Sequence, residues 1–206
     1  MDSTLNLPRL IYLHGFCSSP ASWKSRLLGE FMQARNIGDQ FACPALSPVP
    51  DEAAACVSHL IESLQARGPV TLIGSSLGGH YANFLAEKHN LRAILINPAA
   101  VDRINLDKFI GEHHNYHSGE HFVFSAAHAN QLQAQVTPPT PSRYWLLQEA
   151  GDEVLDYRQA QVFYAGCRQT LLPAGNHSFT QFPQFIPQIL EFAGIRLNKQ
   201  PDPPEL

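Results

Sequence analysis

Charged side chains are few in this 206-residue sequence, at 16% of the residues, and basic ones are scarcer than acidic ones. Lys and Arg number 14 against 18 Asp and Glu, so the formal net charge is −4, and no segment concentrates positive charge. We therefore expect neither a nucleic acid nor an anionic membrane surface as a partner. No apolar run reaches the roughly 18–20 residues that cross a bilayer, so no membrane anchor is expected.

Cysteine is also scarce, and its positions are far apart. The four cysteines, Cys17, Cys43, Cys56 and Cys167, form no C-x-x-C pair. The first eight residues have neither a basic segment nor a long apolar stretch, so we expect no signal peptide. Free thiols in a reducing compartment are then the expected state, and the predicted location is cytoplasmic.

Hydrophobic residues, at 44%, are arranged in strand-like runs that alternate with amphipathic helical segments. Continuous apolar strands in such an alternation predict a mostly parallel sheet with helices on both faces, an α/β fold. In the helix expected at 22–35, Ser22 is the predicted N-cap and Trp23 begins the buried stripe. The other predicted helices are 51–66, the segment after Gly79, 157–165 and one between 179 and 192. The predicted strands are 9–13, 41–43, 70–73, 93–96, 144–147 and 170–172.

The alternation of strands and helices is interrupted once, at about 99–142, where no strong strand is predicted. A connection of this length is unusual in a compact domain, so we expect it to fold over the site as a lid; a disordered loop is the alternative. The whole chain is therefore predicted to be a single domain at 1–198 with this insertion. The proline-rich end at 199–206 is expected to be a flexible tail.

The most informative motif is the G-x-S-x-G pattern of Gly74, Ser76 and Gly78. A strand-like run precedes it and helical apolar spacing follows it, which predicts a sharp strand-to-helix turn with the serine at its tip. Glycines are needed beside the serine because its backbone is strained there and neighbouring Cβ atoms would clash. Ser76 is the predicted nucleophile; a glycine-rich turn without chemistry is the alternative.

A nucleophilic serine needs a base to take its proton and an acid to orient that base. In sheets of this kind both follow the serine along the chain, the acid first. Asp152 and His177 each come just beyond a predicted strand and are the expected acid and base. Asp156 is the main rival for the acid, although it could instead cap the next helix. Glu149 and Glu153 are less favoured and are interpreted as ordinary solvated carboxylates.

Two backbone N–H groups are needed to stabilise the oxyanion that forms during acyl transfer. We expect one from Leu77, directly after the nucleophile, and one from Phe16, in the loop after the first strand. Gly15 permits the turn that points the Phe16 N–H inward. The neighbouring His14 is interpreted as a hydrogen-bonded structural histidine and Cys17 as a small packing residue.

Five motifs together carry a resemblance to a known family: Tyr12-Leu13-His14-Gly15-Phe16 with Ser18-Ser19-Pro20, Gly74-Ser75-Ser76-Leu77-Gly78-Gly79, Asn97-Pro98-Ala99, Gly151-Asp152-Glu153-Val154-Leu155-Asp156-Tyr157 and Gly175-Asn176-His177. Over about Leu10 to Ile195, the sequence resembles the bacterial YqiA-like esterases, which are small α/β-hydrolases. The resemblance implies hydrolysis of carboxylic esters, with acyl-CoA thioesters as a further option, and no cofactor. It also implies Ser76, Asp152 and His177 as the catalytic triad.

A histidine cluster within 113–128 offers a competing site. On a helix, His113, His117 and His121 would share one face and could hold Zn²⁺. Gly119 interrupts such a helix and no carboxylate is clearly placed to orient the imidazoles, so a solvated or lid-packing role is preferred and no metal is expected.

The sequence thus predicts a serine esterase that acts on a small-molecule ester or thioester through an acyl-enzyme on Ser76. Two alternatives remain at this point. One is a non-catalytic small-molecule-binding protein on a hydrolase fold, and the other is a metal-dependent hydrolase that uses the His113–His121 cluster.

Overall fold

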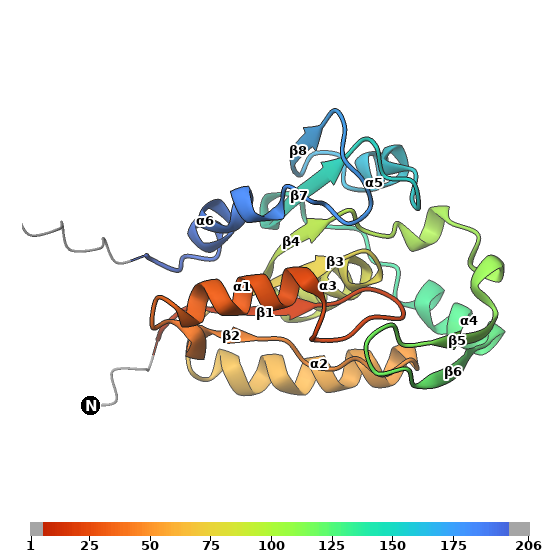
Figure 1. Cartoon of the computed structure of the whole chain (residues 1–206), viewed down its shortest axis with the longest axis horizontal. Helices are drawn as coiled ribbons and strands as arrows, with labels where there is room; N and C mark the ends of the chain where they lie inside the picture. The colour runs from red at the N-terminus through yellow and green to blue at the C-terminus, as the bar shows by residue number, and fades with distance from the viewer. Residues whose placement is uncertain (1–5, 198–206) are drawn as a thin grey trace, which may run out of the picture.

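A six-stranded sheet lies at the centre of the computed structural model, which describes residues 6–197 (Figure 1). The strand order is β2-β1-β3-β4-β7-β8, and every neighbouring pair is parallel, which confirms the predicted α/β-hydrolase sheet. The strands are β1 (Arg9–Leu13), β2 (Phe41–Ala42), β3 (Val70–Ser75), β4 (Arg92–Ile96), β7 (Tyr144–Glu149) and β8 (Arg168–Leu172). The helices are α1 (Trp23–Gln33), α2 (Pro50–Gln65), α3 (Leu77–His89), α4 (Ala126–Ala134), α5 (Tyr157–Phe163) and α6 (Phe182–Phe192).

Helices cover both faces of this sheet because its central strands are apolar on both sides. On one face, α1 and α6 pack against the strands, with Met32 and Ile186 beside Tyr12. On the other face lie α2, α3 and α5, where Val57 of α2 joins Leu72 of β3. These side chains are almost wholly buried, and each contributes about 1.5–3 kcal/mol to stability. Two hydrophobic cores therefore hold the sheet between them.

One predicted core position is wrong. Trp23, expected in the buried stripe of the first helix, is 45% exposed, whereas Leu28 and Met32 of the same stripe are buried. Trp23 is the first residue of α1, and its ring meets that of Phe182 edge to face, at 6.4 Å between centroids. Trp23 also lines a cavity that reaches Ser76.

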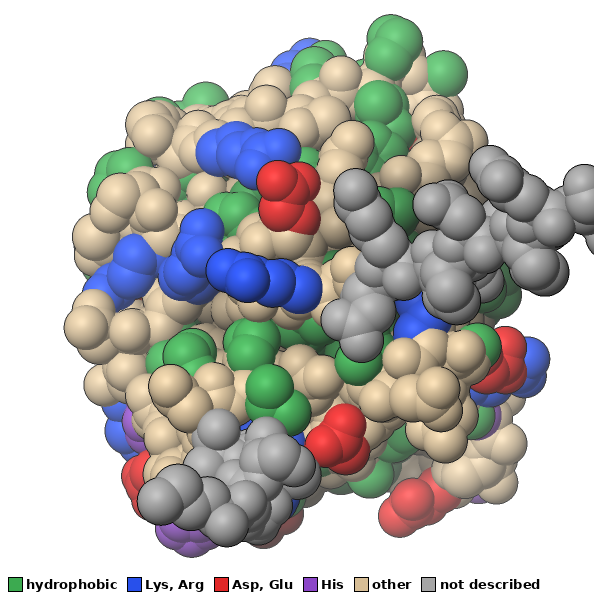
Figure 2. All heavy atoms as spheres, turned by 90° about the vertical axis from the view of Figure 1, so that its left-hand side faces the viewer, with side chains coloured by type: hydrophobic (Ala, Val, Ile, Leu, Met, Phe, Trp, Pro, Cys, Tyr) green, Lys and Arg blue, Asp and Glu red, His purple; other side chains and the backbone are tan. Residues whose placement is uncertain are grey.

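The carboxyl ends of four strands lie level at one edge of the sheet. Gly74 of β3 is opposite Leu13 of β1 and Leu95 of β4, and Ile96 is opposite Leu147 of β7. Loops that leave these strands therefore meet at the same edge. The amino-terminal edge faces the viewer in Figure 2, where a short row of Lys and Arg side chains lies among neutral and acidic ones.

The segment 99–142, which leaves the sheet after β4 and returns at β7, is folded rather than irregular. It contains the antiparallel strands β5 (Gly111–His114) and β6 (His121–Phe124), followed by α4, and lies on the right of Figure 1. The expectation of no strong strand is thus wrong. Its remaining turns are the 3₁₀ segments η2 (Val101–Arg103), η3 (Leu106–Phe109) and η4 (Pro141–Arg143); a further one, η1 (Gly38–Gln40), precedes β2.

Helix α4 attaches this insertion to α2. The Gln135 side chain, directly after α4, donates a hydrogen bond to Asp51 Oδ1 at 3.0 Å, and the Asp51 N–H donates to Gln131 Oε1 at 3.3 Å. Within residues 6–197, no helix combines the length and the apolar character that a bilayer crossing needs. The predicted tail at 199–206 lies outside the described residues.

Candidate active site

Ser76 lies at a strained turn between β3 and α3. Its backbone has φ 57° and ψ −123°, a region that residues with a side chain rarely adopt. Added Cβ atoms at Gly74 and Gly78 would lie 2.1 and 2.0 Å from backbone oxygens, so only glycine fits at either position. The Ser76 N–H donates to the Ile96 carbonyl at 3.0 Å, and the Ser76 carbonyl accepts from the Ala99 N–H at 3.0 Å. The turn is thereby fixed to the end of β4.

The structure brings Ser76, Asp152 and His177 into one hydrogen-bonded chain. His177 Nε2 is 3.0 Å from Ser76 Oγ, and His177 Nδ1 is 2.8 Å from Asp152 Oδ2. With the Nδ1 proton donated to Asp152, Nε2 is free to accept the hydrogen of the serine hydroxyl. This is the geometry in which an imidazole can take the proton of a serine hydroxyl.

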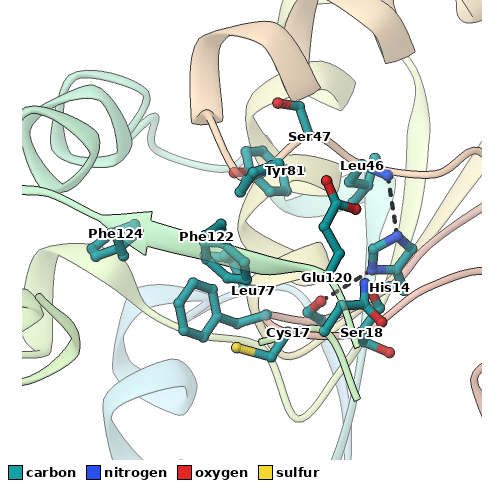
Figure 3. A pocket seen from close by; sticks show the side chains of 14 residues that line it. His14, Cys17, Ser18, Leu46, Ser47, Leu77, Tyr81, Glu120, Phe122 and Phe124 are labelled. Carbon is teal, nitrogen blue, oxygen red and sulfur yellow. Dashed lines mark hydrogen bonds between the residues drawn. The ribbon is translucent and has the colours of Figure 1, made fainter. Parts of the chain in front are cut away.

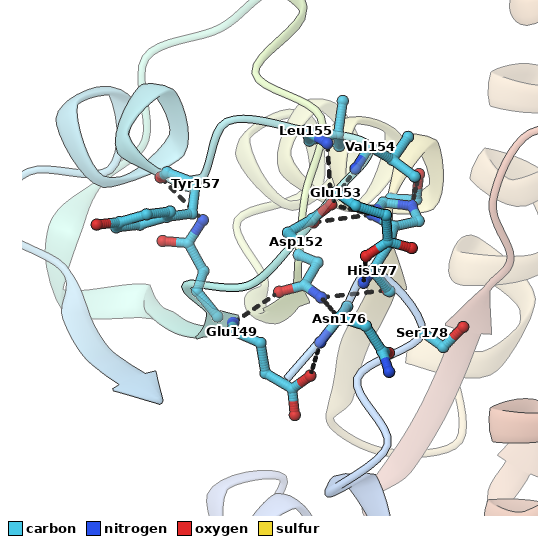
Figure 4. A network of polar contacts seen from close by, with 12 residues as sticks. Glu149, Asp152, Glu153, Val154, Leu155, Tyr157, Asn176, His177 and Ser178 are labelled. Atoms are coloured by element: carbon cyan, nitrogen blue, oxygen red, sulfur yellow. Dashed lines mark hydrogen bonds and ion pairs between the residues drawn. The ribbon is translucent and has the colours of Figure 1, made fainter. Parts of the chain in front are cut away.

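The Asp152 carboxylate is fixed by its own loop. Its side chain is 2% exposed, and Oδ1 accepts the N–H groups of Val154 and Leu155, both at 2.9 Å (Figure 4). Asp156, the rival acid, lies elsewhere: it is the N-cap of α5 and forms an ion pair with Arg158 at 2.8 Å. Of the two aspartates, only Asp152 contacts the imidazole.

Glu149 corrects an expectation, because it is a fully buried side chain and not a solvated one. Its Oε2 accepts the N–H of Asn176 at 2.6 Å, next to His177. Glu153 is exposed as expected, yet its Oε2 accepts the His177 N–H at 2.9 Å. Two carboxylates thus hold the backbone of the histidine loop, and neither contacts the imidazole (Figure 4).

Two further side chains, for which the sequence predicts no role, complete this support. Asn97, directly after β4, donates from Nδ2 to the carbonyl oxygens of Asn176 and His177 at 3.0 and 3.1 Å. Lys24 Nζ, from α1, donates to the Ser178 carbonyl at 2.8 Å. An Asn-Pro pair at a strand end is a signal that could have identified Asn97. Nothing near Lys24 in the sequence indicates its contact, which joins residues 154 positions apart.

Lys24 also carries the positive charge that faces the carboxylates of this site. Burial lowers its pKa to about 8, and the nearby Glu149 and Asp152 carboxylates act in the opposite direction. Because Glu149 is fully buried, an opposite charge close by is what makes its burial tolerable.

The loop after β1 passes over the serine. Gly15 is so close that an added Cβ would lie 3.2 Å from Ser76 Cβ. Phe16 and Leu77, the predicted oxyanion-hole residues, line the same cavity as Ser76. Leu77 is the first residue of α3, and N–H groups of a first helical turn have no acceptor within the helix. The positions suit the role that the sequence predicts for them.

His14 has the structural role that was expected of it. Its Nε2 accepts the Leu46 N–H at 3.2 Å and its Nδ1 donates to the Gly15 carbonyl at 3.1 Å (Figure 3). Burial lowers the pKa of His14, which keeps the ring neutral and these two bonds intact. The ring thereby fixes the loop that carries Phe16. Cys17 is buried, and burial raises its thiol pKa, as befits a packing residue.

The helical alternative for the histidines does not hold, because His113, His117 and His121 lie on the β5–β6 hairpin and its turn. His113 donates from Nε2 to the Phe109 carbonyl at 2.6 Å and packs on the Phe16 ring, with centroids 4.8 Å apart. His128 belongs to the capping box of α4, and its ring contacts Phe124 at the end of β6, with centroids 5.7 Å apart. Among the described residues, no group of three His, Cys, Asp or Glu side chains could hold a metal ion.

Comparisons with known proteins agree with this architecture. A family model described as "Uncharacterised protein family (UPF0227)" matches residues 9–194. Among solved structures, the chain is similar to alpha/beta hydrolase domain-containing protein 10 from mouse, with a TM-score of 0.70 and 18% identity over 91% of this chain and 90% of that one. It is similar to a metagenome-derived lipolytic enzyme of the LipS and LipT study (TM-score 0.67, 16% identity, 95% and 99% covered). It is also similar to the Paleococcus ferrophilus monoacylglycerol lipase (TM-score 0.63, 13% identity, 93% and 97% covered).

Proposed function

Since the chain belongs to the UPF0227 family, the YqiA-like family that its motifs resemble, we propose that it is a serine hydrolase of carboxylic esters. One observation supports this function best: the Ser76 hydroxyl lies 3.0 Å from an imidazole whose other nitrogen lies 2.8 Å from a buried carboxylate. The lipolytic activity named for two of the similar structures favours an ester as the substrate class. Proteins with this fold have many functions, so the site carries the proposal.

In the proposed reaction, His177 Nε2 takes the hydroxyl proton as Ser76 Oγ attacks the ester carbonyl carbon. Asp152 holds the imidazole in position and stabilises its protonated form. The N–H groups of Phe16 and Leu77 stabilise the oxyanion, each by about 3 kcal/mol. The bond from the carbonyl carbon to the alcohol oxygen then breaks, and His177 gives its proton to the leaving alcohol.

The acyl group remains on Ser76 until water replaces the alcohol. His177 takes a proton from this water, whose oxygen attacks the acyl carbon, and then returns the proton to Ser76 as the acid leaves. A thioester presents the same carbonyl carbon to Ser76, so it is the second substrate class to assay. No step in this sequence needs a cofactor.

Kinetics of Ser76→Ala test the proposal. On a p-nitrophenyl ester of a short acid, kcat should fall by on the order of 10³-fold or more, because the covalent route is removed. Ser142→Ala, at an exposed position of η4 that lines neither cavity at Ser76, is the serine control and should retain kcat. Retention of most activity by Ser76→Ala would end the proposal, and activity lost on chelation would instead favour a metal-dependent reaction.

A further inference from the structure

Two cavities with different linings meet at the Ser76 hydroxyl. The larger, of about 400 Å³, and the smaller, of about 290 Å³, both reach Ser76 and His177. Phe16 and Tyr116 line both cavities and therefore lie where the two adjoin. The acyl and alcohol parts of an ester leave its carbonyl carbon in different directions, so each cavity can receive one part.

The larger cavity, which we name the apolar chamber, is walled mainly by the insertion. Its volume falls within the range of small-molecule sites. Glu153 is the charged carboxylate at its rim, and it is already bound to the His177 N–H. The apolar side chains that line it come from the end of η2, from η3, β6 and α4, and from the loop after β7: Ile104, which directly follows η2, and Leu106, Phe109, Phe124, Leu132 and Leu155.

The smaller cavity, which we name the polar chamber, has a different lining. Lys24, His117 and several hydroxyl-bearing side chains face it, among them Ser18 and Ser22. The Ser22 hydroxyl is buried and has no hydrogen-bond partner within the described part of the chain. Burying such a group without a partner is costly, so a ligand hydroxyl or a water that bonds to it gains binding energy.

The chemistry of the second half-reaction decides which part of the ester enters which chamber. The acyl group stays bonded to Ser76, whereas the alcohol departs and water must then reach His177 Nε2 from the vacated side. Water enters the polar chamber readily because hydroxyls and Lys24 line it, and the apolar chamber gives it few partners. The acyl chain therefore belongs in the apolar chamber.

We propose that the substrate is an ester of a medium-length apolar acid with a small hydroxylated alcohol, the acyl chain in the apolar chamber and the alcohol against Ser22 in the polar chamber. This inference rests on the proposed function and adds its substrate class. The Lys24 charge already faces Asp152 and Glu149, so the alcohol is recognised by its hydroxyls and not by an anionic group. The insertion at 99–142 then acts as the wall that selects the acyl chain.

The first test measures kcat/KM over p-nitrophenyl esters from acetate to dodecanoate. For the wild-type chain, kcat/KM should rise about fourfold per added methylene until the chamber is full. Ile104→Trp fills the apolar chamber, so the ester that this variant hydrolyses with the highest kcat/KM should be the acetate. Val162→Trp adds the same ring on the exposed face of α5 and should retain the wild-type optimum. A chain-length profile that Ile104→Trp leaves unchanged overturns the assignment of the apolar chamber.

The second test compares 1-glyceryl hexanoate with propyl hexanoate, which has the same carbon skeleton without the two free hydroxyls. Each hydroxyl that finds a partner should raise kcat/KM about 2- to 12-fold, so the glyceryl ester should be at least fivefold better. Ser22→Ala should bring this ratio toward one, and the ratio cancels any general loss of activity. The Ser22 side chain makes no capping bond to α1, so the substitution removes no helix cap.

The outcomes separate the two proposals. If the wild-type chain hydrolyses no ester, both the proposed function and the substrate class fail. If hydrolysis depends on Ser76 but hexyl acetate exceeds propyl hexanoate, the chambers are assigned in the wrong order and this inference alone is overturned. A glyceryl-to-propyl ratio near one in the wild-type chain also overturns it, while the esterase proposal stands.

Discussion

Glu149 is buried behind the imidazole loop, where a carboxylate is costly unless it is paired and hydrogen-bonded. Its Oε2 accepts the Asn176 N–H, whereas Oε1 has no hydrogen-bond partner within the described residues. Lys24 provides the compensating charge. Glu149, through the Asn176 N–H, and Lys24, through the Ser178 carbonyl, therefore hold the loop of His177 from behind, and the proposed reaction uses neither as acid or base.

Glu149→Ala tests this positioning role. It leaves the partly buried Asn176 N–H without its acceptor, so the free energy of unfolding should fall by about 1 kcal/mol and kcat should fall far more than KM rises. Glu149→Gln keeps an oxygen acceptor and should restore most of kcat. If Ala and Gln variants have the same kcat, the hydrogen bond to the loop is not what matters.

The two aspartates of the loop after β7 give a second prediction. Asp152→Asn should lower kcat by on the order of 10⁴-fold, because the imidazole loses the partner that fixes its tautomer. Asp156→Asn keeps an N-cap side chain on α5 and should leave kcat unchanged. Steady-state kinetics of both variants decide the acid; equal losses would contradict the assignment of Asp152.

The pKa of Lys24 gives a prediction about stability and pH. Its folded pKa, about 8, lies below the ordinary value of 10.5, so between these pH values the unfolded chain binds more protons than the folded one. The folded chain should therefore gain stability from this group as pH rises from about 8 to 10.5. The free energy of unfolding of wild type relative to Lys24→Met, from urea titrations, should increase over that range. A constant difference would mean that Lys24 titrates normally in the folded protein.

At the scale of elements, the β5–β6 hairpin is attached to the loop that carries Phe16. The Tyr116 N–H donates to the Cys17 carbonyl at 2.8 Å, and Asn115 Nδ2 donates to the Ser18 carbonyl at 2.7 Å. Asn115 Oδ1 also accepts the N–H groups of His117 and Ser118, which shape the turn. A movement of the hairpin would therefore be transmitted to the proposed oxyanion hole.

Asn115→Ala removes three of these hydrogen bonds and tests the attachment. Amide hydrogen exchange in 111–124 should become at least tenfold faster, since each lost bond lowers the local opening free energy by about 1 kcal/mol. Ser118→Ala, which loses one bond to the Glu120 N–H, should change exchange much less. Equal protection in both variants would show that the hairpin is held by other contacts.

The elements that the sequence could predict are those with a clear period. The continuous apolar strands and the amphipathic α2 are close to their predicted ranges because local pattern and burial agree there. The strands β5 and β6 were missed because each has four residues and, although exposure alternates along both, apolar and polar residues do not alternate in their sequences. The helical alternative for His113 and His121 arose because histidines four residues apart would also share one face of a helix.

The residues of the site likewise divide into those that the sequence could predict and those that it could not. Ser76, Asp152 and His177 were identifiable because each follows a strand, and a parallel sheet brings such positions together. The burial of Glu149 was not identifiable from the sequence, because it depends on the loop after β8, whose Gly175 packs directly against the carboxylate. The contact of Lys24 likewise depends on how α1 crosses the sheet, which no local pattern contains.

At the scale of the whole molecule, one sheet edge collects side chains that are distant in sequence. Ser76 and His177 are 101 residues apart, and the ends of β3 and β8 place them in contact. The two cores fix the sheet, and the insertion encloses the edge on which the site lies (Figure 1). The proposed chemistry therefore depends on the fold as a unit.

Peptide mapping after reaction with a fluorophosphonate tests the central claim, an activated Ser76, most directly. The phosphonyl adduct should form on Ser76, and the rate of labelling should fall by orders of magnitude in His177→Ala, because the base is lost. Neighbouring Ser75, which is buried in β3, is the internal control and should remain unmodified. An unlabelled Ser76, or labelling at an unchanged rate without the imidazole, would contradict the account.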